Sequence, residues 1–307
     1  MSAPAILRQS VTRRFGTFTA VDAVSLDVPA GAVFGLIGPN GAGKTTTFSM
    51  LCGFLRASAG TVEVLGQPPS RIVALKGRVG VLPQDALLPP NDRLDRVLGF
   101  YARLQGMEAA RAKEEAARVL ASVGLDEAAR KRCGELSHGM VKRAALAQAF
   151  LGDPELVLLD EPTAGLDPKN AHQIRELIVQ LRGRRTVVIS SHNLHELEAM
   201  CDAAAIMDRG RLLASGAMRE LTRATGEIRV VLASAPPPLD EVRALQHVTH
   251  ASWDEGRQTL AVAFETGATS AEDVITTVLR YLLDRGARIS AVHKGHSLEE
   301  RVLELVR

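Results

Sequence analysis

The spacing of apolar and polar residues changes several times along this chain, and each spacing predicts a different kind of element. Residues 6–30 alternate apolar and polar side chains in short runs, which predicts antiparallel strands. Continuous apolar runs predict buried strands at 32–37, 156–159 and 186–192. Shorter strands are predicted at 61–65 and 79–82. Strands alternating with longer segments are typical of an α/β protein.

Helical spacing fills the segments between the later strands. Apolar residues recur at helical spacing from about residue 92 to 130, and an apolar helix follows at 144–150. Residues from about 90 to 150 therefore form a predicted helical insert between strands of the main sheet. A helix from Pro168 to about Leu181 and a hairpin with strands at 204–207 and 211–214 are also predicted.

The character of the sequence changes after about Thr225, where short strands and helices alternate around the break at 236–238. This pattern predicts a small α+β unit. The expected organisation is a first domain at 1–222 and an accessory domain at 223–307. The expected fold class is α/β, with a mainly parallel core sheet, an N-terminal antiparallel β subdomain, a helical insert and a small C-terminal α+β domain.

Composition narrows the class of protein. The chain has 307 residues, of which 46% are hydrophobic and 23% charged, as in a soluble globular protein, and its formal net charge is +2. So weak a charge does not favour nucleic acid as the main partner. We expect neither a secretory signal nor a membrane-spanning helix. Cys52, Cys133 and Cys201 are far apart, which predicts reduced thiols.

The clearest chemical motif is the turn after the apolar run at 32–37. It consists of Gly38, Pro39, Asn40, Gly41, Ala42, Gly43, Lys44, Thr45 and Thr46, and it matches G-x-x-x-x-G-K-[ST] at every fixed position. Glycines let backbone N–H groups converge on phosphate oxygens, and a helix opening at Lys44 adds positive potential. Lys44 is expected to reach the β- and γ-phosphates and Thr45 to hold Mg²⁺. This phosphate loop (residues 38–46) predicts a nucleoside triphosphate site.

Polar residues end three of the predicted strands. Asp160 and Glu161 follow the run 156–159, at the strand end where open α/β sheets bind ligands. Burying adjacent carboxylates is costly without a cation, so Asp160 is suited to hold Mg²⁺ and Glu161 to polarise an attacking water. Gln84 and His192 end two further strands, and either could be structural. Near phosphate, His192 could donate to the γ-phosphoryl oxygens.

Two weaker signals lie elsewhere. Ser137 occupies an N-cap position with Gly139 close behind, so the hydroxyl and the first N–H groups of that helix could face an anion. Phe15 and Phe18 precede the phosphate loop, and an aromatic ring there could stack on adenine or simply pack in a strand. The residues alone do not choose between these alternatives.

The ordered set of motifs over about residues 5–220 resembles the ATP-binding subunit of ATP-binding-cassette (ABC) transporters, which are P-loop NTPases. The set comprises the phosphate loop, Gln84, the segment 136–140 at the position of the family signature, Asp160 with Glu161, the turn 164–167 and His192. The resemblance implies that Phe15, rather than Phe18, stacks on adenine. It also implies that Gln84 contacts Mg²⁺ and water and couples to the membrane subunit, and that His192 is the switch histidine.

The family binds two ATP molecules between head-to-tail subunits. The resemblance therefore implies that Ser137 and Gly139 contact ATP held by the opposite subunit and that Asp167 lies in a dimer-interface loop. It implies ATP and Mg²⁺ as cofactors, a homodimer or heterodimer of ATP-binding subunits, and a separate multi-span membrane permease. The expected location is the cytoplasmic face of the cell membrane, as a peripheral subunit.

The strings around the phosphate loop and around Asp160, with the C-terminal unit ending at 297–300, resemble the ABC-2 group, whose members mostly export drugs, lipids or polysaccharides or serve gliding motility and cell-envelope assembly. One departure concerns the signature segment, where His138 and Met140 replace the usual Gly and Gln. Three functions stay open: an export ATPase, a weakly hydrolysing regulatory subunit in a heterodimer, and a soluble ABC ATPase without a transport role.

Overall fold

The computed structural model describes residues 4–222, 227–233, 235–264, 271–294 and 298–306. The chain divides into two compact units, residues 1–218 and 219–307, which are described separately here. The short helix α8 (Met218–Leu221) spans the boundary.

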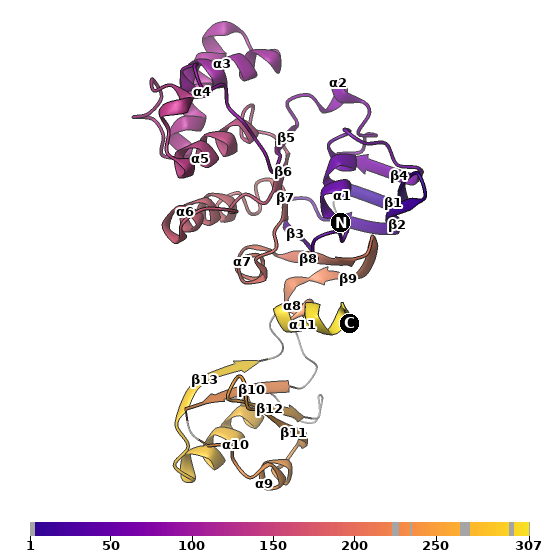
Figure 1. The fold of residues 1–307 in the computed structure, drawn as a ribbon, viewed down its shortest axis with the longest axis vertical. Helices are drawn as coiled ribbons and strands as arrows, with labels where there is room; N and C mark the ends of the chain where they lie inside the picture. The colour runs from indigo at the N-terminus through magenta and orange to yellow at the C-terminus, as the bar shows by residue number, and fades with distance from the viewer. Residues whose placement is uncertain (1–3, 223–226, 234, 265–270, 295–297, 307) are drawn as a thin grey trace. The chain divides into compact units, whose positions relative to one another are not determined.

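A six-stranded sheet forms the centre of the first unit, in the order β5-β6-β7-β3-β8-β9 (Figure 1). Its strands are β3 (Val33–Ile37), β5 (Val79–Leu82), β6 (Leu156–Asp160), β7 (Thr186–Ser190), β8 (Ala203–Asp208) and β9 (Arg211–Ala217). The first five are parallel, and β9 pairs with β8 in the predicted antiparallel hairpin. Every residue of β3, β6 and β7 is buried, which is why their sequences are continuously apolar rather than alternating.

One of the predicted strands is shorter than expected. Strand β7 ends at Ser190, so His192 lies in the turn beyond it instead of ending the strand. In that turn the Ser191 hydroxyl accepts a hydrogen bond from Asn193 N, and Asn193 caps helix α7 (Leu194–Met200). These local polar contacts replace the ladder hydrogen bonds and release the chain from the sheet.

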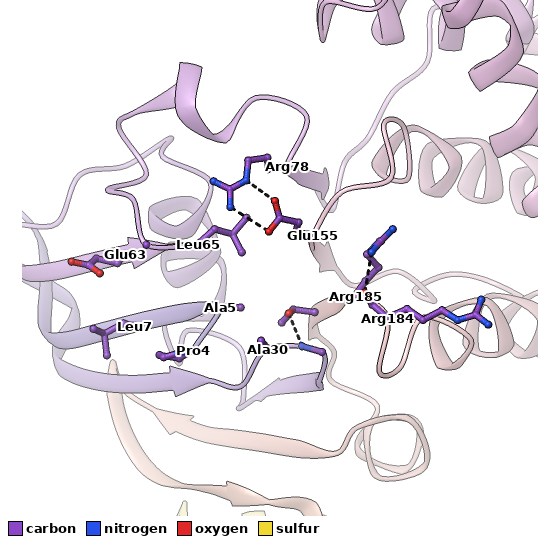
Figure 2. Close-up of a pocket in the computed structure, with 13 residues that line it drawn as sticks. Pro4, Ala5, Leu7, Ala30, Glu63, Leu65, Arg78, Glu155, Arg184 and Arg185 are labelled. Carbon is purple, nitrogen blue, oxygen red and sulfur yellow. Dashed lines mark hydrogen bonds and ion pairs between the residues drawn. The ribbon is translucent and has the colours of Figure 1, made fainter. Parts of the chain in front are cut away.

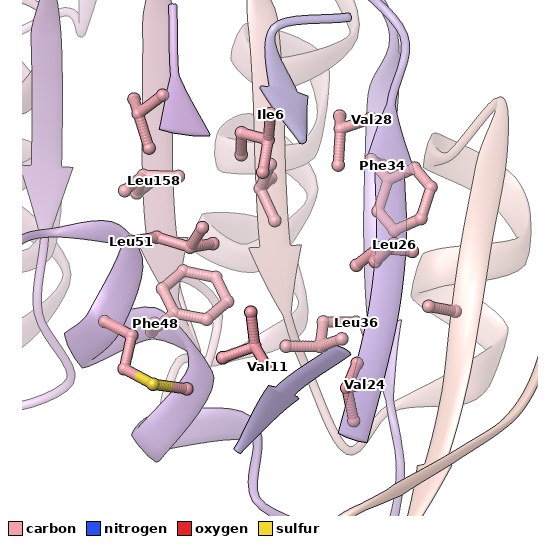
Figure 3. Close-up of a cluster of buried hydrophobic side chains, with 14 of the residues drawn as sticks. Ile6, Val11, Val24, Leu26, Val28, Phe34, Leu36, Phe48, Leu51 and Leu158 are labelled. Atoms are coloured by element: carbon pink, nitrogen blue, oxygen red, sulfur yellow. The ribbon is translucent and has the colours of Figure 1, made fainter. Parts of the chain in front are cut away.

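A separate three-stranded antiparallel sheet contains β2 (Phe18–Val28), β1 (Ile6–Phe15) and β4 (Ala59–Val64), in that order. Helix α1 (Lys44–Leu51) contacts β2 and β4 of this sheet and β6 of the central sheet. Figure 3 shows Phe48 and Leu51 of α1 among Ile6 and Val11 of β1 and Leu158 of β6. This core anchors the helix that begins at the phosphate loop.

The predicted helical insert is present between β5 and β6. It contains α3 (Leu94–Leu104), α4 (Ala109–Ser122), the 3₁₀ turn η1 (Cys133–Glu135) and α5 (His138–Ala149), while the short α2 (Ile72–Leu75) precedes β5. Helices α3, α4 and α5 pack on one another through Leu94, Leu98, Ala116, Leu120 and Leu146, all of them buried. Helix α6 (Pro168–Val179) contacts α7, which in turn packs on β3, on the side of the central sheet opposite α1 (Figure 1).

The second unit is an α+β arrangement. Its elements are β10 (Glu227–Leu232), α9 (Leu239–Arg243), β11 (Val248–Asp254), β12 (Thr259–Phe264), α10 (Ala271–Asp284), β13 (Ile289–Lys294) and α11 (Leu298–Leu305). The antiparallel sheet has the order β11-β12-β10-β13, so the six elements from β10 to β13 form a ferredoxin-like βαββαβ unit. Val230 and Val262 pack with Val278 of α10 in a core of its own. Ser297, part of the resemblance to the ABC-2 group, lies outside the described residues.

Among the helices that the structure describes, none combines the length and the apolar character that a membrane crossing requires.

Candidate active site

The predicted site residues gather at one edge of the central sheet because neighbouring parallel strands end together. Leu82 of β5 is in register with Leu159 of β6, Asp160 with Ser190 of β7, and Ser190 with Leu36 of β3. Gln84, Glu161, His192 and the phosphate loop therefore leave the sheet at the same edge. This is the edge at which open α/β sheets bind ligands.

The phosphate loop folds around its own lysine. Lys44 Nζ donates hydrogen bonds to the carbonyl oxygens of Gly38 (2.6 Å) and Pro39 (3.1 Å). Burial lowers the pKa of Lys44, while the negative charges of Glu161 and Asp160 act to raise it. The amine therefore lies within electrostatic reach of both acids, between the loop that would surround phosphate and the carboxylates.

Gly43 caps α1 in the left-handed conformation, with φ 96°, and a Cβ there would lie 2.6 Å from the carbonyl oxygen of Ala20. Gly41 has a similar φ of 83°, but a Cβ there would meet nothing within 4 Å. Both alanine variants pay the left-handed penalty of about 1–2 kcal/mol. We expect Gly43→Ala to be less stable than Gly41→Ala and to lose ATP binding, because only Gly43→Ala must displace backbone.

The comparison needs only the two variants, thermal unfolding and an ATP titration. Gly41→Ala is the matched control for conformational strain. Equal stability and equal ATP affinity of the two variants would show that the approach of Ala20 to Gly43 does not constrain this loop.

Asp160, Glu161, Ser190 and His192 form one hydrogen-bonded group. The Ser190 hydroxyl donates to Asp160 Oδ1, and Glu161 N donates to both Ser190 O (3.1 Å) and Ser190 Oγ (3.2 Å). Glu161 Oε2 lies 2.9 Å from His192 Nδ1. The Glu161 side chain is 11% exposed and that of His192 68%, so the imidazole faces outward from a nearly buried carboxylate.

Glu161 also has an uncommon backbone conformation, with φ 50°. A positive φ at a residue other than glycine is uncommon and costs free energy. Here the two hydrogen bonds from Glu161 N to Ser190 hold it. The residue with this backbone conformation is also the one whose carboxylate contacts His192.

The remaining predicted ligands are accessible. Gln84 and Thr45 are exposed, and Lys142 Nζ of α5 donates to Gln84 O at 3.4 Å. Phe15 is 44% exposed and Phe18 64%. The Arg13 guanidinium carbon lies 4.5 Å from the centroid of the Phe15 ring.

The signature segment (residues 136–140) contacts the turn 164–167 of the same chain. Ser137 Oγ caps α5, accepting from Met140 N at 3.4 Å, as the N-cap prediction requires. A Cβ at Gly139 would lie 2.7 Å from the Asn170 side chain, whose Nδ2 donates to Asp167 Oδ2 at 2.5 Å. Asp167 also caps α6 through the backbone N–H groups of Lys169 and Asn170, and its pKa is lowered first by the Asn170 side chain.

Sequence reasoning missed Ser190, Asn170, Arg13 and Glu196. The Glu196 carboxylate accepts hydrogen bonds of 2.6 Å from Thr163 Oγ1 and from Arg175, so it ties α7 to the segment after Glu161 and to α6. Thr163, Arg175, His192 and Glu196 also line a cavity of about 350 Å³. Only Ser190 gave a usable signal, as a hydroxyl at the end of a buried strand, two positions before His192.

A second cavity, of about 570 Å³, lies near the opposite ends of the parallel strands (Figure 2). Arg78 and Glu155, which come just before β5 and β6, form a two-pronged ion pair beside it. None of the predicted site residues lines this cavity. The candidate site is therefore the edge at the carboxyl ends of the strands and not this cavity.

Comparison with known proteins decides the family. Residues 21–164 match the family described as "ABC transporter", and residues 132–198 also match one described as "AAA domain, putative AbiEii toxin, Type IV TA system". The chain is 38% identical over 257 residues to the "Nod factor export ATP-binding protein I" of Burkholderia orbicola, covering 82% of this chain and 84% of that protein. The chain belongs to the ABC transporter ATP-binding family.

A second relative and a solved structure support the same family. The "Linearmycin resistance ATP-binding protein LnrL" of Bacillus subtilis is 32% identical over 277 residues and is matched over 88% of each chain. The structure of cbiO1 from Clostridium perfringens, part of the ABC transporter complex cbiONQ, superimposes with a TM-score of 0.65 at 25% identity, covering 72% of this chain and 91% of that chain. The predicted α/β cassette fold is confirmed, and this ABC protein is an ATPase.

Proposed function

We propose that this ABC ATPase uses the edge at Lys44, Asp160, Glu161 and His192 to hydrolyse Mg-ATP and drive export through a separate membrane subunit. The observation that carries the proposal is the 2.9 Å contact between Glu161 and His192, directly after Asp160 and within electrostatic reach of Lys44. A carboxylate held by an exposed imidazole beside a phosphate loop fits a water-polarising base with a partner that can reach phosphate.

The donor set fits Mg²⁺ bound together with a nucleotide. Thr45, Gln84 and Asp160 offer a hydroxyl, an amide and a carboxylate oxygen, and oxygen atoms are the ligands that Mg²⁺ prefers. Thr45, Gln84 and Asp160 are the proposed protein ligands. When bound, Mg²⁺ would neutralise charge on the β- and γ-phosphates.

The proposed roles divide the nucleotide among the site residues. The N–H groups of residues 38–46 and the Lys44 amine bind phosphate, so Lys44 exchanges the carbonyls of Gly38 and Pro39 for phosphate oxygens. Glu161 accepts a proton from the attacking water, and His192 orients Glu161 and donates to the γ-phosphate. Phe15 stacks on adenine. Catalysis is then mainly positioning and charge stabilisation.

The proposed working unit contains two ATP-binding subunits arranged head to tail. The signature residues Ser137 and Gly139 then complete the site of the opposite subunit, with Asp167 at the interface. Ser137 is exposed and can reach a second subunit, whereas Gly139 is buried against Asn170 of its own chain, so Asn170 would have to move aside for the Gly139 contact.

A surface near Gln84 suits the membrane subunit. Ile72, Val73 and Leu87 are at least 70% exposed, and Phe100 lies beside a cavity of about 390 Å³ on α3. Exposed apolar side chains of this kind would be covered if they met on an apolar face of a membrane subunit. The name of the Nod factor export relative supports export as the direction, and the sequence around the phosphate loop and Asp160 supports the ABC-2 group as the class. The proposed location is the cytoplasmic face of the membrane, as a peripheral subunit.

The double substitution Val73→Glu and Leu87→Glu tests the proposed docking. We expect it to move the chain from the membrane fraction of the native host to the supernatant while the purified protein keeps its ATPase rate, because charge opposes apolar docking away from the nucleotide. Leu283→Glu, at a 59% exposed position of the second unit, is the control. Unchanged sedimentation of the double variant would refute this docking surface.

A further inference from the structure

Arg13 lies behind the aromatic ring proposed to bind adenine. It precedes Phe15 by two positions in β1, so the two side chains share one face of the strand. The guanidinium carbon lies 4.5 Å over the ring centroid, which is the geometry of a cation–π contact. One face of the Phe15 ring is thereby covered, while the side chain as a whole keeps 44% of its surface exposed.

Other contacts hold the guanidinium in place. One terminal nitrogen of Arg13 donates to the carbonyl oxygen of Arg56 at 2.9 Å. Arg56 belongs to the segment that leads from α1 to β4, and the neighbouring Ser58 N donates to Thr12 O at 2.7 Å. Arg13 Nε is buried and has no hydrogen-bond partner among the described residues, so the stem is enclosed as well. Arg13 thus connects the segment after the phosphate helix with the Phe15 ring.

We propose that Arg13 is a positioning residue that holds the Phe15 ring in the orientation in which its free face stacks on adenine. The inference rests on the proposed adenine contact of Phe15 and extends it. A ring fixed before binding loses less side-chain freedom when the base arrives, so affinity for the base rises. The guanidinium acts on the nucleotide only through the ring, and the phosphates are bound independently at residues 38–46.

Calorimetric titration of the full chain separates these two parts of the nucleotide. The ligands are Mg-ADP, which carries the base, and inorganic tripolyphosphate, which does not. We expect Arg13→Ala to weaken Mg-ADP binding about two- to fivefold, as the loss of one exposed cation–π contact would. Tripolyphosphate binding stays unchanged, and Phe15→Ala weakens Mg-ADP binding about 5- to 150-fold.

Two further variants complete the design. In the background of Phe15→Ala, removing Arg13 has no further effect, because there is no ring left to position. Arg14→Ala, at the exposed neighbouring position on the other face of the strand, leaves both ligands unaffected.

The outcomes are distinct. If Phe15→Ala binds Mg-ADP as the unaltered chain does, the adenine contact itself is wrong. If Phe15→Ala loses affinity and Arg13→Ala does not, Arg13 has no positioning role. Equal loss of Mg-ADP and tripolyphosphate in Arg13→Ala would assign Arg13 to the stability of the segment around Arg56 and overturn the proposal.

Discussion

Glu161→Gln is expected to lower the ATPase rate about 10²- to 10⁴-fold while the protein still binds Mg-ATP. Glutamine keeps the size of the side chain and can still hydrogen-bond His192 Nδ1, but its amide cannot accept a proton from water. The left-handed backbone at position 161 is equally open to both residues. The steady-state rate with Mg²⁺, measured against a sample with EDTA, gives the loss directly.

The chain supplies a matched control for this variant. Glu176 also pairs with a histidine, His172, at 3.3 Å, but on the exposed surface of α6. Glu176→Gln should leave the rate unchanged. A Glu161→Gln protein that hydrolyses ATP as fast as the unaltered chain would disprove the assigned base.

The same variant tests the dimer. Without hydrolysis to reopen it, a head-to-tail pair should persist, so size-exclusion chromatography of Glu161→Gln should show a dimer with Mg-ATP and a monomer without nucleotide. A Glu161→Gln protein that binds ATP but stays monomeric would contradict a homodimer with two ATP sites. It would favour a heterodimer, in which His138 and Met140 prevent two copies of this chain from closing on ATP without a different ATP-binding subunit.

Arg8→Met is expected to stabilise the first unit by about 3 kcal/mol. Arg8 is 1% exposed, and none of its three guanidinium nitrogens has a hydrogen-bond partner among the described residues. Burial lowers its pKa to about 10, and this shift corresponds to a cost of about 3 kcal/mol for keeping the buried guanidinium charged. Methionine ends at the level of Arg8 Nε and needs no partner, its flexible side chain can adapt to the space that the guanidinium leaves, and apolar replacement of buried charges typically gains about 1–4 kcal/mol.

The pH dependence follows from the lowered pKa. Below about pH 10 Arg8 is charged in both folded and unfolded chains. Burying its charge then lowers the free energy of unfolding by the full amount, and the stability gained from Arg8→Met does not change with pH. Above about pH 10 the folded chain gives up the Arg8 proton before the unfolded chain does, and the stability gained from methionine shrinks. The cost of Arg8 therefore applies fully at neutral pH.

The measurement needs a probe of the first unit. The single tryptophan, Trp253, belongs to the second unit, so urea unfolding is followed by far-UV circular dichroism instead of tryptophan fluorescence. Arg8→Lys keeps a buried charge and should bring no gain, and Arg14→Met should change stability by less than about 0.5 kcal/mol. A less stable Arg8→Met protein would mean that the guanidinium has a favourable role in the core.

Much of the fold could be predicted because the backbone elements follow local pattern. The continuous apolar runs became β3, β6 and β7, and the alternating residues 6–30 became β1 and β2. Alternation also places position 8 on the same strand face as Ile6, yet it could not show that an arginine there stays buried with no hydrogen-bond partner in the described part of the chain. Side-chain burial depends on what other segments cover, which no local pattern records.

The sequence by itself determined the motifs, their order and the strand ends that bring them to one edge, because parallel strands with buried sequences must end together. Only the tertiary structure decided the strand order of the sheet, the turn that takes His192 beyond β7 to Glu161, and the contacts of Gly139 with Asn170 and of Arg13 with Phe15. Each of these contacts joins residues from separate elements. The distance between such residues depends on how helices and sheets pack, so the contacts form only in the folded chain.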